Sequence, residues 1–173
     1  EIYDTTMGWR FVNPKMKQLY GIDEMGTTAE NVANDFNISR EDQDQMALRS
    51  QIKAEKAQSN GDLANEILPV NIPQRKGEDI IFDMDEHLRP GSTIEGLQKL
   101  RPAFQEGGSV TAGNSSGIND GSCALIIASE DSAKANGLTP KARILGLAAG
   151  GVPPRVMGIG PVPSTQKLMA RLG

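Results

Sequence analysis

The residues best suited to chemistry lie in a glycine-, serine- and asparagine-rich stretch between Gly107 and Gly121. Its centre, residues 111–117, reads TAGNSSG. Small side chains there would let the backbone approach a ligand closely, with the Ser116 hydroxyl and main-chain amides as hydrogen-bond donors. A flexible linker is the alternative interpretation of the same composition. Because the flanking runs look buried, the pattern also fits an ordered ligand-binding loop.

Cys123 and His87 are the other candidates, and each has a plainer interpretation. Cys123 stands in an aliphatic run, where a thiol is more often an inert small hydrophobe than a nucleophile. His87 stands beside Glu86 and fits a surface loop. One His and one Cys fall short of the roughly four ligands of a structural zinc site. We therefore expect no metal site and no catalytic triad built on these two residues.

Composition narrows the class of protein further. The chain has 173 residues, a net charge of −4 and 4% aromatic residues, which fits a close-packed aliphatic α/β body. Because the net charge is negative and the basic residues are scattered, we expect neither nucleic-acid nor membrane binding. No apolar run approaches the ~18 residues of a membrane span. The single cysteine excludes an internal disulfide and fits a reducing cytoplasm.

Two helices are predicted in the first third of the chain, after an irregular segment over residues 1–25. Thr27 and Glu30 have the spacing of a capping box, and apolar residues follow at helical spacing. Ser39, with Asp42 three residues on, is expected to begin a longer helix that ends at Asn60-Gly61.

The remaining two-thirds mixes strand and helix signals. Runs 66–72 and 79–84 predict a hairpin, and 89–91 a turn. Continuous aliphatic runs are typical of strands buried on both faces, and helices are expected between and around them. The strands are predicted at 123–128 and 142–148, and the helices at 93–100, 132–137 and 164–172.

Five ordered segments resemble motifs of the thiolase family, and together they span nearly the whole chain. They are 25–33 (MGTTAENVA), 39–44 (SREDQD), 100–104 (LRPAF), 110–121 (VTAGNSSGINDG) and 156–161 (VMGIGP). Residues 4–14 (DTTMGWRFVNP) are similar to thiolases that act on 3-oxoadipyl-CoA.

The resemblance implies an α/β fold class, with an α+β loop domain inserted in a thiolase fold. Residues 1–119 would form the loop domain that covers coenzyme A (CoA). Residues 120–139 would end the N-terminal core, and 140–173 would open the C-terminal core. The family's two catalytic cysteines and its catalytic histidine lie outside the matched motifs. We therefore expect no catalytic residue in this chain and no turnover by it alone.

The same resemblance implies a binding surface for CoA and its acyl group. Arg89 would meet the nucleotide end, where a guanidinium suits a phosphate or stacks on adenine. Methionines would form adaptable apolar walls near the acyl end. The pantetheine path would be lined by Phe104, Ala112, Ser116 and Ile118, and the acyl end by Met16, Met25 and Met157. Glu24 stands where the family often has histidine.

The implied reaction is an acyl-CoA:CoA C-acyltransfer that cleaves 3-oxoadipyl-CoA to succinyl-CoA and acetyl-CoA through a cysteine acyl-enzyme. A general 3-ketoacyl-CoA or acetoacetyl-CoA thiolase is the close alternative, and a non-catalytic CoA-binding module is an alternative of another class. CoA is a substrate and no further cofactor is expected. The complete enzyme would be a cytoplasmic homo-oligomer, a dimer or tetramer, without nucleic-acid or membrane partners.

Arg10 is a candidate for binding the far carboxylate of a 3-oxoadipyl group, since arginine holds carboxylates in a bidentate fork. A structural ion pair beside a packed Trp9 is the alternative. In the complete enzyme, Arg10→Met should lower kcat/KM for 3-oxoadipyl-CoA more than for acetoacetyl-CoA, by ~2–3 kcal/mol. Steady-state kinetics on both substrates measure the difference, and equal losses would assign Arg10 to structure.

Overall fold

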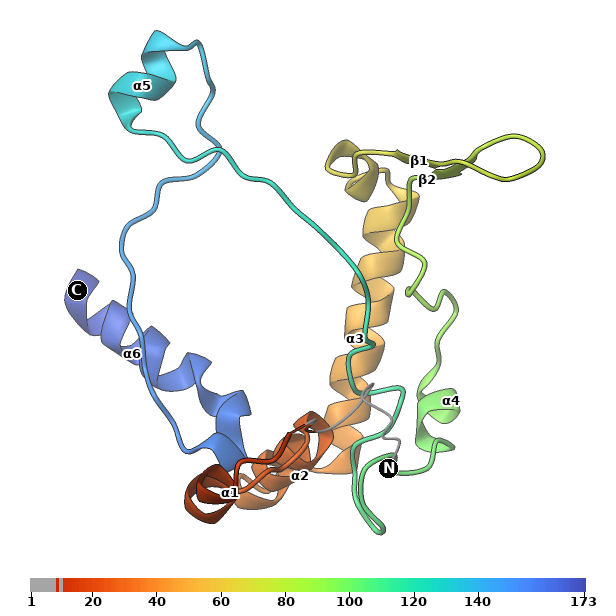
Figure 1. Ribbon diagram of the computed structural model, residues 1–173, viewed down its shortest axis with the longest axis vertical. Helices are drawn as coiled ribbons and strands as arrows, with labels where there is room; N and C mark the ends of the chain where they lie inside the picture. The colour runs from red at the N-terminus through yellow and green to blue at the C-terminus, as the bar shows by residue number, and fades with distance from the viewer. Residues whose placement is uncertain (1–8, 10) are drawn as a thin grey trace.

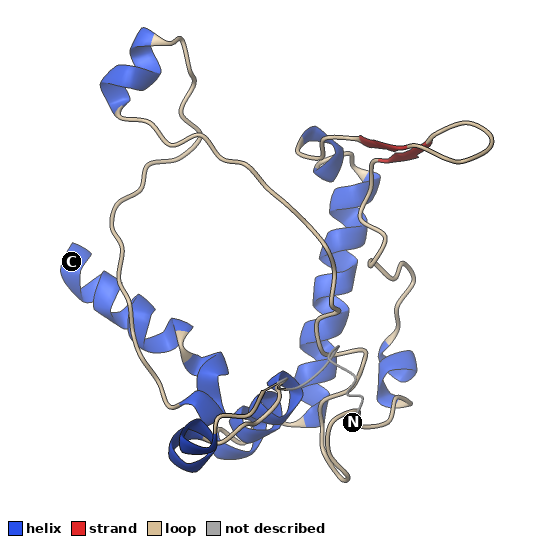
Figure 2. Cartoon of the chain, viewed as in Figure 1, coloured by secondary structure: helices blue, strands red, loops and turns tan. Residues whose placement is uncertain are grey.

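The computed structural model describes Trp9 and residues 11–173, so Arg10 and most of the 4–14 segment lie outside the described residues. The elements are drawn in Figure 1 and coloured by type in Figure 2. In chain order they are α1 (Pro14–Tyr20), α2 (Met25–Asp35), α3 (Arg40–Ser59), a 3-10 turn η1 (Leu63–Asn65), β1 (Val70–Ile72), β2 (Ile80–Phe82), α4 (Ile94–Gln98), α5 (Glu130–Ala135), a 3-10 segment η2 (Pro154–Ile159) and α6 (Pro161–Leu172).

The chain is an open ring rather than a compact body (Figure 1). Long connections run from the α3–α4 region out to α5 and back to α6. The accessible surface is 14506 Å², whereas a compact monomer of 18.5 kDa would expose about 8,200 Å². Among the described residues the buried apolar ones are correspondingly few, namely Ala33, Leu97, Val110, Ala133 and Val156. Except for Ala133, they lie on α2, α4, η2 and the segment before residue 111.

Helix α2 forms where the sequence predicts it, but its start differs from the prediction. The cap residue is Glu24, which makes no side-chain capping bond, and Thr27 already lies inside the helix. The Thr28 hydroxyl donates to the Met25 carbonyl at 2.7 Å. Glu30 is fully buried and accepts from a distant segment instead of returning to the helix start. The predicted capping box is therefore wrong, because a tertiary contact takes its carboxylate.

The ends of α3 follow the predicted signals. The Ser39 Oγ accepts from the Asp42 amide at 3.0 Å, and acidic residues in the first turn complement the helix dipole. The helix ends at Ser59 with Asn60 as its C-cap, and Gly61 follows with φ of 79°. A left-handed residue here favours glycine, so the predicted end is confirmed.

Helix α1 was not predicted from the sequence, although its signal is present there. The Asn13 Oδ1 accepts from the Lys15 amide at 2.9 Å and from the Met16 amide at 3.3 Å. Pro14 occupies the first helical position, where its fixed φ and missing N–H cost nothing. The Asn-Pro pair is thus a helix start inside a segment that looked irregular.

The hairpin and α4 are confirmed, with shorter elements than predicted. Strands β1 and β2 pair antiparallel, with Asn71 opposite Ile81. The Thr93 Oγ1 caps α4 by accepting from the Gly96 amide at 3.1 Å. Pro90 and Gly91 form the expected turn, and Gly91 has φ of 70°. Figure 2 shows the hairpin projecting from the far end of α3.

The two buried strands predicted at 123–128 and 142–148 are not formed within the described chain. Both runs are extended and exposed; Leu125 is 85% and Ile126 84% accessible. A strand requires a hydrogen-bonded neighbour, and no described segment pairs with either run. The predicted helices near them do form, as α5 and as α6, which begins at Pro161.

Polar contacts join α2 to η2 across a long sequence separation. The Arg155 guanidinium pairs with the Asp35 carboxylate, and this hydrogen bond and charge raise the pKa of Arg155. The Asn31 Nδ2 donates to Asp23 Oδ2 at 2.7 Å and to the Arg155 carbonyl at 2.9 Å. These contacts hold the start of the C-terminal region against α2. None of the helices within the described residues is long and apolar enough to cross a membrane.

The packing of Gly26 yields a stability prediction. A Cβ added at Gly26 would lie 2.1 Å from the Phe104 ring, so Gly26→Ala should lower the free energy of unfolding by about 1–3 kcal/mol through overpacking. Gly96→Ala in α4 is the control, because its Cβ would meet only the Thr93 Oγ1 at 3.4 Å. Helix propensity should make that change neutral or stabilising by up to about 1 kcal/mol. Urea denaturation measures both, and equal behaviour would contradict the Phe104 contact.

Candidate functional site

A cleft of about 840 Å³ lies between α2, α3, the 104–118 segment and η2. This volume falls within the range of small-molecule sites, about 300–1,000 Å³. Most of the lining side chains are apolar, and the polar ones are spread along it. The apolar lining includes Met25, Ala29, Val32, Ala33, Ile38, Met46, Phe104, Val110, Ile118 and Met157.

The α2 wall depends on close packing against Phe104. The ring lies over Gly26, where any larger residue would displace it. Met25 precedes this glycine and is 69% exposed, and Ala29 and Val32 follow it along the cleft. The α2 wall is therefore an apolar surface whose outer part remains accessible to a ligand.

The facing wall is attached to α2 by the buried carboxylate of Glu30. The Ser109 amide donates to both carboxylate oxygens, at 2.9 and 3.0 Å, and the Ser109 hydroxyl donates at 3.0 Å. The Val110 amide donates at 2.8 Å. Gly108 permits this approach, because a Cβ there would lie 2.3 Å from Glu30 Oε1. The segment before residue 111 is thus fixed to α2.

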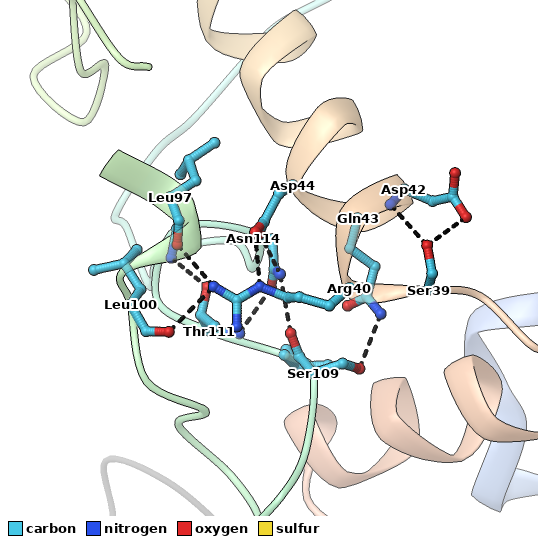
Figure 3. Close-up of polar contacts among 12 residues, drawn as sticks. Ser39, Arg40, Asp42, Gln43, Asp44, Leu97, Leu100, Ser109, Thr111 and Asn114 are labelled. Carbon is cyan, nitrogen blue, oxygen red and sulfur yellow. Dashed lines mark hydrogen bonds and ion pairs between the residues drawn. The ribbon is translucent and has the colours of Figure 1, made fainter. Parts of the chain in front are cut away.

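A second polar cluster fixes the same segment to α3 (Figure 3). The Arg40 Nε lies 2.7 Å from Asp44 Oδ2, and Asp44 is fully buried. The Asn114 Nδ2 donates to Asp44 Oδ1 at 3.0 Å and to the Ser109 carbonyl at 3.1 Å, while its Oδ1 accepts from the Thr111 amide at 2.7 Å. These bonds fold residues 109–114 into one ordered turn.

The Arg40 guanidinium also connects this cluster to α4. Its Nη2 donates to the Leu97 carbonyl at 2.7 Å and to the Leu100 carbonyl at 3.1 Å (Figure 3). The Ser115 hydroxyl donates to the Thr111 carbonyl at 2.7 Å. The glycine-rich stretch is therefore an ordered loop as far as residue 116, and an extended connection beyond it.

Five of the residues predicted to bind acyl-CoA line this one cleft. They are Met25, Phe104, Ser116, Ile118 and Met157. They come from α2, from the 104–118 segment and from η2, so only the fold brings them together. Met16 lies on α1 and Ala112 is exposed in the 111–114 turn, and neither lines the cleft. Arg10 lies outside the described residues.

Arg89 lies outside the cleft, in the exposed loop after the hairpin. Its Nη1 donates to the carbonyls of Glu86, His87 and Leu88 at 3.1–3.2 Å. Its amide donates to the Gln51 Oε1 at 2.9 Å. Leu88 borders a second hollow of about 660 Å³, which shares Ile118 with the cleft. The guanidinium thus orders its own loop, which borders this second hollow.

For His87 the structure agrees with the predicted environment, and for Cys123 it does not. His87 is exposed, as predicted, and its imidazole packs on Gly117, where a Cβ would lie 2.3 Å from its Cε1. Cys123 is exposed rather than buried, because the run that carries it is unpaired. Across Trp9 and 11–173, no group of three or more His, Cys, Asp or Glu side chains could hold a metal ion.

The sequence interpretation missed the residues that hold the cleft together. Glu30, Asp44 and Asn114 all stand within the quoted motifs, yet their roles depend on partners 70 to 80 positions away. It also missed the α3 wall, where Gln43, Met46 and Arg49 line the cleft. Glu30 lies beside the apolar face that residues 29, 32, 33 and 36 predict, so no local pattern indicated its buried contact.

The arrangement suits binding more than bond-making. The cleft has a long apolar surface with main-chain groups and hydroxyls from the ordered loop along one wall, and its described ionisable residues are Glu24, Asp42 and Arg49. Such a surface can hold a flexible chain that carries amide groups.

Comparisons with known proteins agree with this architecture. The family model described as "Thiolase, N-terminal domain" matches residues 6–131. The chain is 58% identical over 173 residues to a beta-ketoadipyl-CoA thiolase of Pseudomonas putida, and 57% identical to the 3-oxoadipyl-CoA/3-oxo-5,6-dehydrosuberyl-CoA thiolase of Escherichia coli K12. Both matches cover 100% of this chain and 43% of the relative.

A solved structure gives the same assignment. The acetyl-CoA acetyltransferase of Bacillus anthracis matches with a TM-score of 0.83 and 40% identity, over 98% of this chain and 44% of that one. The predicted α/β fold class is confirmed by this likeness, and the chain spans less than half the length of these relatives. The ordered loop, the apolar cleft and the family match together place this chain in the thiolase family.

Proposed function

We propose that this chain is the central part of a thiolase that cleaves 3-oxoadipyl-CoA, and that it supplies CoA and acyl-group binding. The observation that carries the proposal is the gathering of Met25, Phe104, Ser116, Ile118 and Met157 in one cleft. These are residues that the family resemblance assigns to the pantetheine path and the acyl end. The identity of 58% to a beta-ketoadipyl-CoA thiolase supports the acyl group.

The chemistry of the cleft fits an acyl-CoA arm. Pantetheine is a flexible chain with two amides and a terminal sulfur, so it needs apolar contact along its length and a few polar partners. Met25 and Met157 are unbranched and adapt to different acyl groups. The ordered turn before Ser116 presents its hydroxyl and main-chain amides beside this apolar surface.

In the proposed reaction, a cysteine thiolate of the complete enzyme attacks the 3-keto carbon of 3-oxoadipyl-CoA. The bond between C2 and C3 breaks, and the carbanion that remains takes a proton and leaves as acetyl-CoA. The succinyl group stays on the cysteine as a thioester. The thiol of a second CoA then attacks it, giving succinyl-CoA and restoring the cysteine. This chain holds both CoA species in position, and orientation supplies much of the rate gain.

We propose the domain division that the resemblance implied, with the loop domain at 1–119, the end of the N-terminal core at 120–139 and the start of the C-terminal core at 140–173. In support, the buried residues around the cleft all precede residue 119, apart from Val156. The exposed aliphatic runs at 123–128 and 142–148 suit strands that pair within core sheets.

The localisation, oligomeric state and partners of the complete enzyme are inferred from the same resemblance. We propose a cytoplasmic homo-oligomer, a dimer or tetramer, with CoA and acyl-CoA as its small-molecule partners. A thiolase for acetoacetyl-CoA or general 3-ketoacyl-CoA is the second candidate. It is supported by the 52% identity, over 149 residues, to an acetyl-CoA acetyltransferase of Paracoccus denitrificans.

The direct test is thiolytic cleavage by the complete enzyme. With CoA present, kcat/KM for 3-oxoadipyl-CoA should exceed that for acetoacetyl-CoA, because the acyl group is the proposed determinant of specificity. The reverse order would favour the second candidate. Binding of CoA without cleavage of either substrate would favour the non-catalytic module.

Arg89 is the proposed contact for the nucleotide end of CoA. In the complete enzyme, Arg89→Ala should weaken CoA binding by ~1–3 kcal/mol, the scale of a charge-assisted hydrogen bond. If the role is confined to binding, KM for CoA rises and kcat changes little. Arg143→Ala is the control, because Arg143 is exposed and pairs only with Glu130 among the described residues. An unchanged KM for CoA would contradict the role of Arg89.

A further inference from the structure

Glu30 is a buried carboxylate whose described partners are all neutral donors. It is 1% exposed, and its hydrogen bonds come from the Ser109 amide and hydroxyl and from the Val110 amide. Among the described residues no cation pairs with it, and Arg40 pairs with Asp44 instead. A buried charge is tolerated only when its hydrogen bonds replace water, so these donors must stay in place.

The location of this contact connects the two walls of the cleft. Glu30 stands on α2, from which Met25, Ala29 and Val32 line one wall. Its donors, Ser109 and Val110, are the first two residues of the 109–116 turn, which contributes Ser115 and Ser116 to the other wall. Any change in the Glu30 contact therefore changes how the two walls face each other.

The type of contact determines geometry as well as stability. An apolar residue at position 30 could fill the space while tolerating small shifts of the facing segment. Two carboxylate oxygens that accept from successive amides fix both distance and orientation. The Asn114 bond to Asp44 fixes the same segment to α3, so the 109–116 turn is held from two helices.

We propose that Glu30 is a positioning residue for CoA binding, because its carboxylate sets the placement of the 109–116 turn against α2 across the cleft. The inference rests on the proposed acyl-CoA function of the cleft. It differs from a plain packing role in one respect. Loss of the contact changes affinity for CoA in a protein that remains folded.

The first test is Glu30→Gln in the complete enzyme. Glutamine has the same size, and its oxygen can keep the bonds made at Oε1. Its NH2 group in place of Oε2 would lie 3.0 Å from the Ser109 amide, donor against donor, and the negative charge would be lost. The Kd for CoA by titration calorimetry and the KM for CoA should each rise at least about tenfold, the scale of one lost hydrogen bond to a charged group. The kcat at saturating CoA should fall by a smaller factor.

Two further variants change the same contact. One replaces the first test if Glu30→Gln does not fold, and the other should raise the Kd for CoA by a smaller factor. Gly108→Ala would place a Cβ 2.3 Å from Glu30 Oε1, so it should raise the Kd as Glu30→Gln does. Ser109→Ala removes only the hydroxyl bond and keeps both amide bonds, so its Kd should rise less than about threefold. Glu130→Gln is the matched control, since Glu130 is an exposed ion-pair partner on α5 and its Kd should be unchanged.

The possible results distinguish a failure of the Glu30 proposal from a failure of the proposed CoA-binding function. A wild-type enzyme that fails to bind CoA refutes the proposed function and this inference with it. A wild-type enzyme that binds CoA, with an unaltered Kd in folded Glu30→Gln, refutes the inference alone. If Glu30→Gln does not fold, Gly108→Ala decides, and a wild-type Kd in that folded variant refutes the inference. Circular dichroism and thermal melting establish folding in each case.

Discussion

Two buried carboxylates determine how the folded part of this chain is put together. Glu30 on α2 and Asp44 on α3 are nearly inaccessible, and each accepts hydrogen bonds from the segment 109–114. A buried carboxylate without its donors is strongly unfavourable, so both helices are bound to that segment. The apolar core is too small to specify this arrangement. Polar contacts therefore set the geometry, and apolar contacts line the cleft that results.

Because polar contacts set the geometry and apolar side chains form most of the lining, the cleft combines a fixed frame with adaptable walls. The cleft is held in shape by hydrogen bonds of residues outside its lining, among them the Arg40–Asp44 pair. Its walls can then be adaptable, with methionines and a phenylalanine whose exposed parts are free to contact a ligand. A site for a long flexible substrate benefits from both properties, since a fixed frame lowers the cost of ordering the bound chain.

The extended runs beyond residue 117 show what happens to aliphatic segments that have no neighbouring strand among the described residues. The 123–128 and 142–148 runs have the aliphatic composition of buried strands, yet they remain exposed because no described strand lies beside them. After these runs, contacts of Asn31 and Asp35 with Arg155 hold η2 against α2. Local sequence sets the conformation of such a run, but burial needs a partner.

The sequence alone determined the elements with local causes: the α3 cap at Ser39, its end at Gly61, the hairpin, α4, and the ordered motifs that indicate the thiolase family. Tertiary structure alone decided where these elements meet. Glu30 has the spacing of a capping residue, yet it serves a segment 79 positions away, because buried amides there compete for its carboxylate. The cleft likewise gathers residues from Glu24 to Gly158, and no local pattern carries information about contacts that distant.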